Sequence, residues 1–290
     1  MAIHENIIES KSNQIATPAF NGTNPTLAAD QALVPKVAEA VKAAGKVLLK
    51  RFSPEARPAN LAELLDDIKA NDEASEAPLR HALLAIRPDA QWAEDEEAGG
   101  LLPPGEWWIA DPAEGNVNHI HGMTEWAVTA TRVRNNKPVL TAVYLPLADT
   151  MYTAVQGGGA YQDGVRLHAS MKPKLDAALV GTGQAKPGED KETFRRIGES
   201  ITAMLGNALL VRASVPATLV LIQVAAGRMD AFWQYSQVRS GLLAGALLVS
   251  EAGGLVTDTH GVPWTLASHD LLAASGGIHA ATVEVLSTVQ

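Results

Sequence analysis

The sequence predicts an α/β protein in which layers of helix and sheet alternate. Residues 34–52 carry apolar side chains at helical spacing, and residues 126–167 alternate in the β-branched pattern of an antiparallel meander. Residues 217–227 and 242–252 are apolar enough to be buried helices. Such helices must pack against another layer, so helices stacked on sheets are the simplest architecture.

The elements before the meander follow in order. Residues 1–30 form a polar leader that we expect to be flexible, and residues 34–52 form the first long helix. The segment from Asn71 to Ser75 resembles a helix start, with Asp72 near the N-terminus of the helix that follows. Residues 91–93 predict a short strand. Residues 107–110 predict a buried strand that Asp111-Pro112 then breaks.

The elements after the meander are also distinct. Residues 180–183 predict a strand that meets a glycine turn, and residues 192–205 an amphipathic helix. Gly253-Gly254 caps the last apolar helix. Since no linker interrupts residues 31–290, we expect a single domain, made of a half with the acidic motifs (31–170) and a C-terminal half (171–290).

Composition excludes several classes of function. The net charge is −9 and no Lys/Arg cluster occurs, which argues against binding a nucleic-acid polymer. The absence of cysteine excludes disulfides and thiolate metal sites and is consistent with a cytoplasmic protein. No apolar run is long enough to span a membrane, so we expect no membrane association.

The segment from Trp108 to Asn118 carries the clearest chemical signal. Asp111 should lie at the end of a strand, with Glu114 on the next turn. Two carboxylates so placed can hold a divalent cation, and the N–H groups of Gly115 and Asn116 can face a phosphate. An acidic protein with an anionic substrate needs such a cation, although the segment alone is equally typical of a solvated acidic turn.

The order of these blocks along the chain resembles that of the inositol monophosphatase-like proteins, members of the lithium-sensitive, magnesium-dependent phosphatase superfamily. The blocks include Asn-Asp, Glu-Glu, Asp-Pro-x-acid-Gly, Gly-Gly-Gly-Ala, Ala-Ala-Gly-Arg-x-Asp-Ala-Phe-Trp and Glu-Ala-Gly-Gly, and they cover about residues 34–285. The resemblance implies an αβαβα sandwich, as in fructose-1,6-bisphosphatase, and a homodimer.

The resemblance also implies metal-assisted hydrolysis of a phosphate monoester, with Mg²⁺ as the cofactor and Mn²⁺ as a substitute. The matching metal ligands are Glu96, Asp111 and the carbonyl of Ala113, with Asp72 at a weaker third position. All are oxygen donors, as Mg²⁺ prefers. The substrate would be a small phosphorylated or anionic metabolite whose identity the sequence does not reveal.

Three departures from the family fall on the expected site. Glu114 replaces an Asp that binds metal, which lengthens the side chain by one methylene. Asn116 replaces a Thr that positions the attacking water, and an amide cannot relay a proton as a hydroxyl does. Gly241 stands where the second-metal Asp is expected and has no side chain to replace it. Glu96, Glu114 and Asn116 are therefore the expected catalytic residues of a degenerate site.

The expected substrate wall differs too. Val215-Pro216 replaces a Gly-Ser pair, and Val220 replaces a nearby Asp. Arg239 precedes the vacated position, where it could bind a phosphate together with Gly115, Asn116 and the space at Gly241. An ordinary surface salt bridge is the other interpretation of Arg239.

Single residues leave further alternatives open. His119 and His121 could ligate a metal or act as an acid–base pair if extended. Such a pair is more often one surface and one buried, satisfied histidine. Trp107, Trp108, Trp126 and Phe232 are better explained as core than as a stacking platform. The turn at residues 157–159 fits a hairpin, since no helix follows to make a phosphate loop.

Two functions remain compatible with the sequence. The first is a Mg²⁺-dependent phosphoric monoester hydrolase that acts on a sugar, polyol or nucleotide phosphate, with weakened or altered activity. The second is a repurposed or inactive scaffold that binds an anionic metabolite, or catalyses another reaction, without the second metal.

Overall fold

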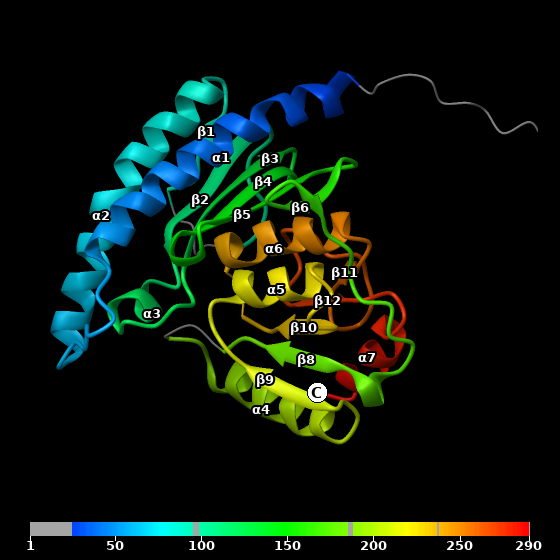
Figure 1. Cartoon of the computed structure of the whole chain (residues 1–290). Coiled ribbons are helices and arrows are strands. Elements are labelled where there is room, and N and C mark those ends of the chain that lie inside the picture. Colours follow the sequence, from blue (N-terminus) through cyan, green and yellow to red (C-terminus); the bar gives the residue numbers. More distant parts are fainter. Residues whose placement is uncertain (1–24, 95–98, 185–187, 237, 290) are drawn as a thin grey trace, which may run out of the picture.

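The computed structural model describes residues 25–94, 99–184, 188–236 and 238–289. Two sheets and their helices stack into five layers, α–β–α–β–α (Figure 1). This confirms the predicted αβαβα sandwich. The helices are α1 (Pro25–Arg51), α2 (Leu61–Ile86), α3 (Asn116–Ile120), α4 (Lys191–Leu205), α5 (Ala217–Ala225), α6 (Arg239–Glu251) and α7 (His279–Leu286).

The first sheet has seven strands in sequence order, and every neighbouring pair except the parallel β1·β2 is antiparallel. The meander predicted from residues 126–167 supplies most of it. Its members are β1 (Gln91–Trp92), β2 (Glu106–Glu114), β3 (Ala127–Arg134), β4 (Lys137–Leu145), β5 (Thr150–Val155), β6 (Gly159–Gln162) and β7 (Val165–Arg166).

The second sheet has five strands in the order β11-β12-β10-β8-β9 and mixes parallel with antiparallel pairs. Its strand β8 confirms the strand expected at residues 180–183. The members are β8 (Leu179–Thr182), β9 (Leu210–Ala213), β10 (Ala231–Gln234), β11 (Leu255–Thr257) and β12 (Leu271–Ala274).

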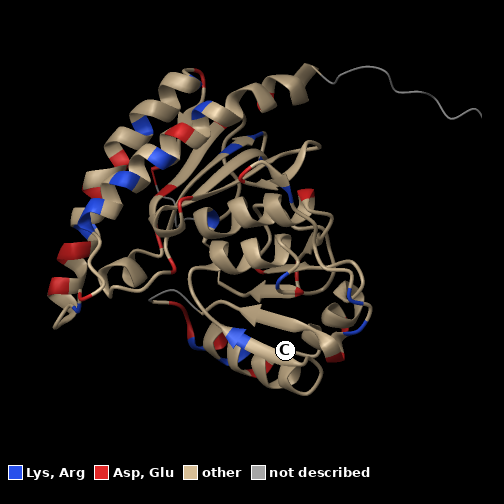
Figure 2. Cartoon of the chain, in the orientation of Figure 1, with Lys and Arg blue, Asp and Glu red and all other residues tan. Residues whose placement is uncertain are grey.

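Strand periodicity explains why helices cover both faces of each sheet. In β4, Leu140 and Ala142 pack with α1 and α2, whereas Val143 points to the opposite face and packs with α5 and α6. In β10, Phe232 packs toward α5 and α6, and Trp233 packs toward α4 and α7. The helices α5 and α6 thus lie buried between the sheets, which agrees with their almost complete lack of charged residues in Figure 2.

The middle layer depends on one close contact between helices. A Cβ on Gly245 of α6 would lie 2.3 Å from Cδ1 of Leu221 on α5. Only glycine allows the two helices to approach this closely, because any larger residue would overlap the Leu221 side chain.

Three predictions of element boundaries were wrong. The first helix begins at Pro25, nine residues before the expected Val34, and so crosses the boundary placed at residue 30. Asp72 does not begin a helix: α2 starts after Asn60, whose side chain accepts a hydrogen bond from the N–H of Glu63. Pro112 does not end β2, which continues to Glu114 through an irregularity in its register with β3.

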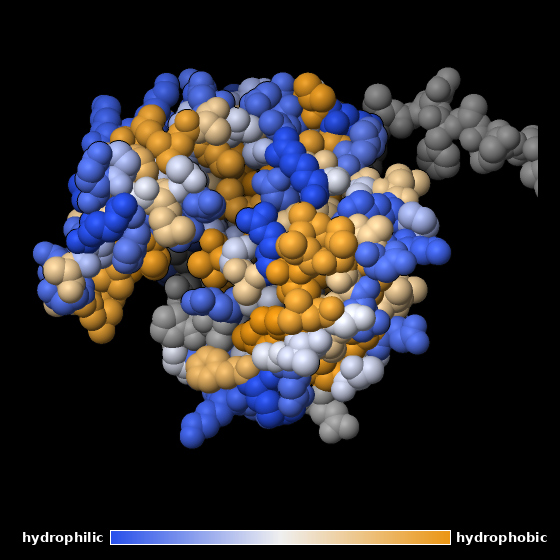
Figure 3. All heavy atoms as spheres, turned by 60° about the horizontal axis from the view of Figure 1, so that its bottom comes forward, coloured by the Kyte–Doolittle hydropathy of each residue, from blue (hydrophilic) through white to orange (hydrophobic). Residues whose placement is uncertain are grey.

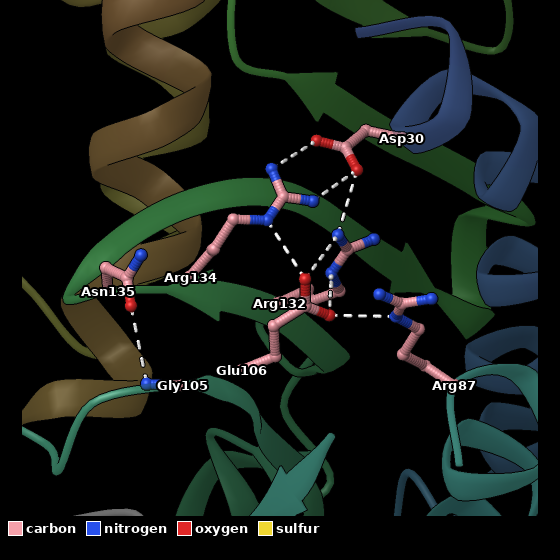
Figure 4. Close-up of polar contacts among 7 residues, drawn as sticks. All are labelled: Asp30, Arg87, Gly105, Glu106, Arg132, Arg134 and Asn135. Atoms are coloured by element: carbon pink, nitrogen blue, oxygen red, sulfur yellow. Dashed lines mark hydrogen bonds and ion pairs between the residues drawn. The ribbon is translucent and has the colours of Figure 1, made fainter. Parts of the chain in front are cut away.

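A buried ion-pair cluster ties α1 to the first sheet (Figure 4). Asp30 of α1 accepts from Arg132 at 2.9 Å and from Arg134 at 2.8 and 3.1 Å. Glu106 of β2 pairs with Arg134 at 3.0 Å and with Arg87 at 2.8 Å. Asp30 and Arg132 are only 3% and 1% exposed, so their pairing offsets the cost of burying the two charges.

Candidate functional site

A cavity of about 300 Å³ opens between the outer helix α2, the end of β2 and the beginnings of α5 and α6. Figure 3 views the molecule from below and shows its surface hollowed between the α2 side and the lower body. The described residues around the cavity include three carboxylates, Asp72, Asp111 and Glu114. The same wall contains Ala113, Gly115, Asn116, Val215, Pro216 and Gly241. Sequence-predicted residues from distant parts of the chain therefore meet at one cavity.

Asp111 lies where β2 becomes irregular. Its carboxylate accepts a hydrogen bond from the N–H of Ala113 at 2.8 Å, and its own N–H donates to Oγ1 of Thr129 at 3.3 Å. These contacts fix the backbone on both sides of Pro112 and leave the carboxyl group half-buried at the cavity. Glu114 belongs to the same strand, not to a following turn as expected, and it faces the same cavity.

Glu114 is the most deeply buried of the three carboxyl groups. The residue is 4% exposed, and Oγ1 of Thr218 lies 3.1 Å from its Oε2 and 2.9 Å from the carbonyl oxygen of Gly241. Burial, and then the charge of Asp111, raise the pKa of Glu114 well above its usual value, while the Thr218 hydrogen bond opposes this shift. A cation in the cavity would relieve both causes of the shift.

Gly241 lies in the first turn of α6, directly beside Glu114. A Cβ built on Gly241 would be 3.8 Å from Oε1 and 3.9 Å from Oε2 of Glu114. The longer Glu114 therefore brings its carboxylate next to the position from which the side chain is missing. Glu114 and Gly241 are therefore neighbours in space.

Gly115 turns the chain from β2 into α3. Its φ of +78° lies in the left-handed region, and an added Cβ would be 2.7 Å from the carbonyl oxygen of Glu125. Glycine is needed here on both counts. The turn places Asn116 at the start of α3, where its Nδ2 donates to Asp72 Oδ1 at 2.9 Å and to the carbonyl of Ile68 at 3.1 Å.

His119 and His121 are one buried and one partly exposed histidine, and not a pair at the cavity. They lie on the helix α3 and its C-cap, not on an extended segment. His119 is 3% exposed, and its ring nitrogens contact Asn71 and the carbonyl of Leu48. His121 is partly exposed and contacts the carbonyl of Val117. Neither is among the described residues that line the cavity.

Arg239 is buried, which excludes the exposed salt-bridge interpretation. Its Nη2 donates to the carbonyls of Gly99 and Gly100 at 2.8 and 3.1 Å. Arg239 is also absent from the described lining of the cavity, although it adjoins Gly241.

Other expected residues complete the picture. Glu96 lies outside the described residues. Trp108, Trp126 and Phe232 are buried in the core, as predicted, while Trp107 is partly exposed and donates to the carbonyl of Pro103.

Within the described ranges, no three Asp, Glu, His or Cys side chains are close enough to hold a metal ion together. No helix in the described part of the chain is long and apolar enough to cross a membrane.

Sequence reasoning missed three polar residues of this region. Thr218 is a hydroxyl within an apolar helix, and this signal could have identified it. Gln184 and Gln234 line the cavity, but nothing in their local sequence distinguishes them.

Comparison with known proteins gives one consistent result. The model of the inositol monophosphatase family matches residues 30–290. The chain is 31% identical over 261 residues to an inositol-1-monophosphatase of Rhizobium meliloti, covering 89% of this chain and 97% of that protein. It is 31% identical over 238 residues to the Nus factor SuhB of Pseudomonas aeruginosa, covering 80% and 85%.

A solved structure of the same family has a similar fold. The inositol monophosphatase of Anabaena sp. PCC 7120 superposes with a TM-score of 0.73 at 26% identity. The match covers 90% of this chain and 98% of that one.

Proposed function

Because this chain belongs to the inositol monophosphatase family, we propose that it is a Mg²⁺-dependent phosphatase of a small sugar, polyol or nucleotide monoester. The observation that carries the proposal is the position of Glu114. Its buried carboxylate faces the same cavity as Asp111 and lies against Gly241, the position where the family pattern has an acidic ligand. Glu114 thereby supplies a carboxylate in place of the missing one.

The chemistry of the available donors fits the metal. Asp111 and Glu114 offer carboxylate oxygens and Ala113 a carbonyl. Asp72 lines the same cavity without forming a cluster of three carboxylates with them, and Glu96 would add a further carboxylate. The raised pKa of Glu114 supports this fit, since a carboxyl group buried beside another acid is poorly stabilised without a cation. When bound, Mg²⁺ neutralises phosphate oxygens and activates water; Mn²⁺ would serve as a substitute.

The chain's own groups would then bind and orient the substrate. Gly115 and Asn116 line the cavity, and their N–H groups would donate hydrogen bonds to phosphate oxygens. Thr218 would hold the Glu114 carboxylate in place. Asn116 donates to Asp72 through its Nδ2, and its Oδ1 accepts from Asn71 and keeps one lone pair that would orient a water.

A direct assay tests this proposal. Purified protein is incubated with a panel of phosphate monoesters in Mg²⁺ or Mn²⁺, and released phosphate is measured. We expect turnover that EDTA abolishes and that Asp111→Ala reduces at least about a hundredfold. Absence of phosphate release from the whole panel would contradict the proposal.

One observation favours a second candidate, a scaffold that binds without hydrolysis. Gly241 contributes no ligand of its own, and one relative of 31% identity is a Nus factor and not an inositol monophosphatase by name. Binding of an anionic metabolite that EDTA does not affect would support this candidate over the first.

A homodimer, proposed from the family resemblance, is tested separately by analytical ultracentrifugation.

A further inference from the structure

A chain of buried side-chain hydrogen bonds leads from the site into the core beneath α3. Asn116 donates to Asp72 at the cavity and accepts, through its Oδ1, from Nδ2 of Asn71 at 2.8 Å. The same Nδ2 lies 3.0 Å from Nδ1 of His119. On the far side, Nε2 of His119 is 3.0 Å from the carbonyl of Leu48. Asn71 and His119 are both buried, at 2% and 3% exposure.

The ends of this chain fix the direction of every bond in it. The carbonyl of Leu48 only accepts, so Nε2 of His119 carries the proton and Nδ1 is left as an acceptor. At the other side, the guanidinium of Arg51 only donates, and its Nε contacts Oδ1 of Asn71 at 2.7 Å. The amide nitrogen of Asn71 must therefore point toward His119 and Asn116.

The orientation of the Asn71 amide in turn sets that of the Asn116 amide at the cavity. Since Asn71 donates to Oδ1 of Asn116, the Nδ2 of Asn116 points the other way and donates to Asp72 and Ile68. Both hydrogens of each amide nitrogen are thereby used. A network with every donor and acceptor matched holds a single arrangement, whereas loss of the His119 acceptor leaves a buried N–H of Asn71 unpaired and weakens its hold on Asn116.

We propose that His119 is a positioning residue, which acts through Asn71 to hold the Asn116–Asp72 pair at the cavity. The role of this pair in metal binding rests on the proposed function. Packing keeps the His119 ring in place: its centroid lies 5.5 Å from that of Phe52 and 4.7 Å from that of Trp126, both in edge-on contact. His119 is thus neither a metal ligand nor an acid–base group, and its effect on the site is indirect.

The test uses His119→Phe, which keeps an aromatic ring between Phe52 and Trp126 but removes both nitrogens. The matched control is His121→Phe, since His121 lies next to the same helix and its ring, among the described residues, hydrogen-bonds a carbonyl of that helix and not Asn71. The first measurement is made on metal-free protein by ¹H–¹⁵N NMR of the side-chain amides. We expect His119→Phe to shift the Asn71 and Asn116 signals and to speed their hydrogen exchange, and His121→Phe to leave both unchanged.

The second measurement is Mg²⁺ titration by calorimetry. His119→Phe should weaken Mg²⁺ binding about tenfold, as losses behind metal ligands commonly do. In an Asn116→Ala background the same substitution should change the affinity by less than about twofold, because the connection to Asp72 is already broken.

Two results would overturn the proposal: unchanged Asn116 amide signals in His119→Phe, or an equal loss of Mg²⁺ affinity in both backgrounds. Failure of the wild-type protein to bind Mg²⁺ would instead contradict the proposed metal site. The amide spectra would then decide alone whether His119 positions Asn116.

Discussion

The carboxylate of Glu114 lies against the backbone of Gly241, so close that a methyl group added to the glycine would be 3.8 Å from Oε1. These residues are far apart in sequence, on β2 and α6. Under the proposed function, the carboxylate of Glu114 takes the place of an acidic ligand at residue 241, and the closeness of the two residues supports this compensation.

A second acid at position 241 should therefore destabilise the metal-free protein. In Gly241→Asp the new carboxyl group would stand beside the buried Glu114, and two acids that share one site disfavour each other's charged form. Gly241→Asn is the matched control of nearly equal size. Urea unfolding in EDTA should show lower stability for the Asp variant, and Mg²⁺ should reduce the difference. Equal stability of the two variants would contradict the proximity.

Removal of the Thr218 hydroxyl should lower both the stability of the protein and its affinity for Mg²⁺. Thr218→Val keeps the shape of the side chain but leaves Glu114 without its buried donor, at a cost of about 1–2 kcal/mol in unfolding free energy. Mg²⁺ affinity should fall as well. The control is Thr282→Val on α7, because that buried hydroxyl, within the described part of the chain, hydrogen-bonds a carbonyl of its own helix region, that of Ile278. A loss of Mg²⁺ affinity in the control would refute a specific role for Thr218.

The ion-pair cluster predicts a loss of stability in acid. Burial alone would raise the pKa of Glu106, but hydrogen bonds from Arg87 and Arg134 and the charge of Arg132 lower it to about 2. The pKa is lower in the folded than in the unfolded protein. The contribution of Glu106 is therefore full above the unfolded value of about 4.5 and declines as the pH falls toward 2.

Urea unfolding of wild type and Glu106→Gln checks this sign. The variant should be less stable at pH 7, and the difference between the two proteins should shrink as the pH falls from about 4.5 to about 2. A difference that stays constant over this range would show that Glu106 does not titrate with a lowered pKa.

The anchoring of α1 should depend on Asp30. Asp30→Asn removes the negative charge between Arg132 and Arg134 and leaves the buried Arg132 guanidinium poorly compensated, at a cost of about 3–5 kcal/mol. Thermal unfolding measures this loss. Lys42→Gln on the same helix breaks an exposed pair with Asp149 and should cost far less stability than Asp30→Asn. Similar losses for the two variants would argue against a structural role of the buried cluster.

Local sequence patterns predicted most of the fold but not the contacts of the site. The meander, the amphipathic α4 and the apolar α5 and α6 each show their own periodicity, so they were predictable. The start of α2 was not: the acidic, polar residues from Asn71 to Ser75 look like a cap, although the helix already runs from Leu61. None of the first ten residues of α2, before Asn71, is buried, so core packing does not mark where this helix begins.

The site residues were predictable as a set because the family blocks bring Asp72, Asp111 and Glu114 together. Their mutual arrangement was not predictable. Thr218 reaches Glu114, and Asn71 reaches His119, only because separate elements pack side by side. Such pairs leave no spacing in the sequence, and the same holds for the turn of Arg239 toward Gly99.

The proposed compensation between Glu114 and Gly241 is tested most directly by shortening the acidic side chain at residue 114 and adding an acidic side chain at residue 241. Mg²⁺ affinity is measured by calorimetry for wild type, Glu114→Asp, and Glu114→Asp/Gly241→Asp. Shortening residue 114 withdraws the carboxylate by one methylene and should weaken binding at least about tenfold. Adding the acid at 241 should restore most of it. Affinity that is unchanged in Glu114→Asp, or not recovered in the double variant, would contradict the role assigned to Glu114.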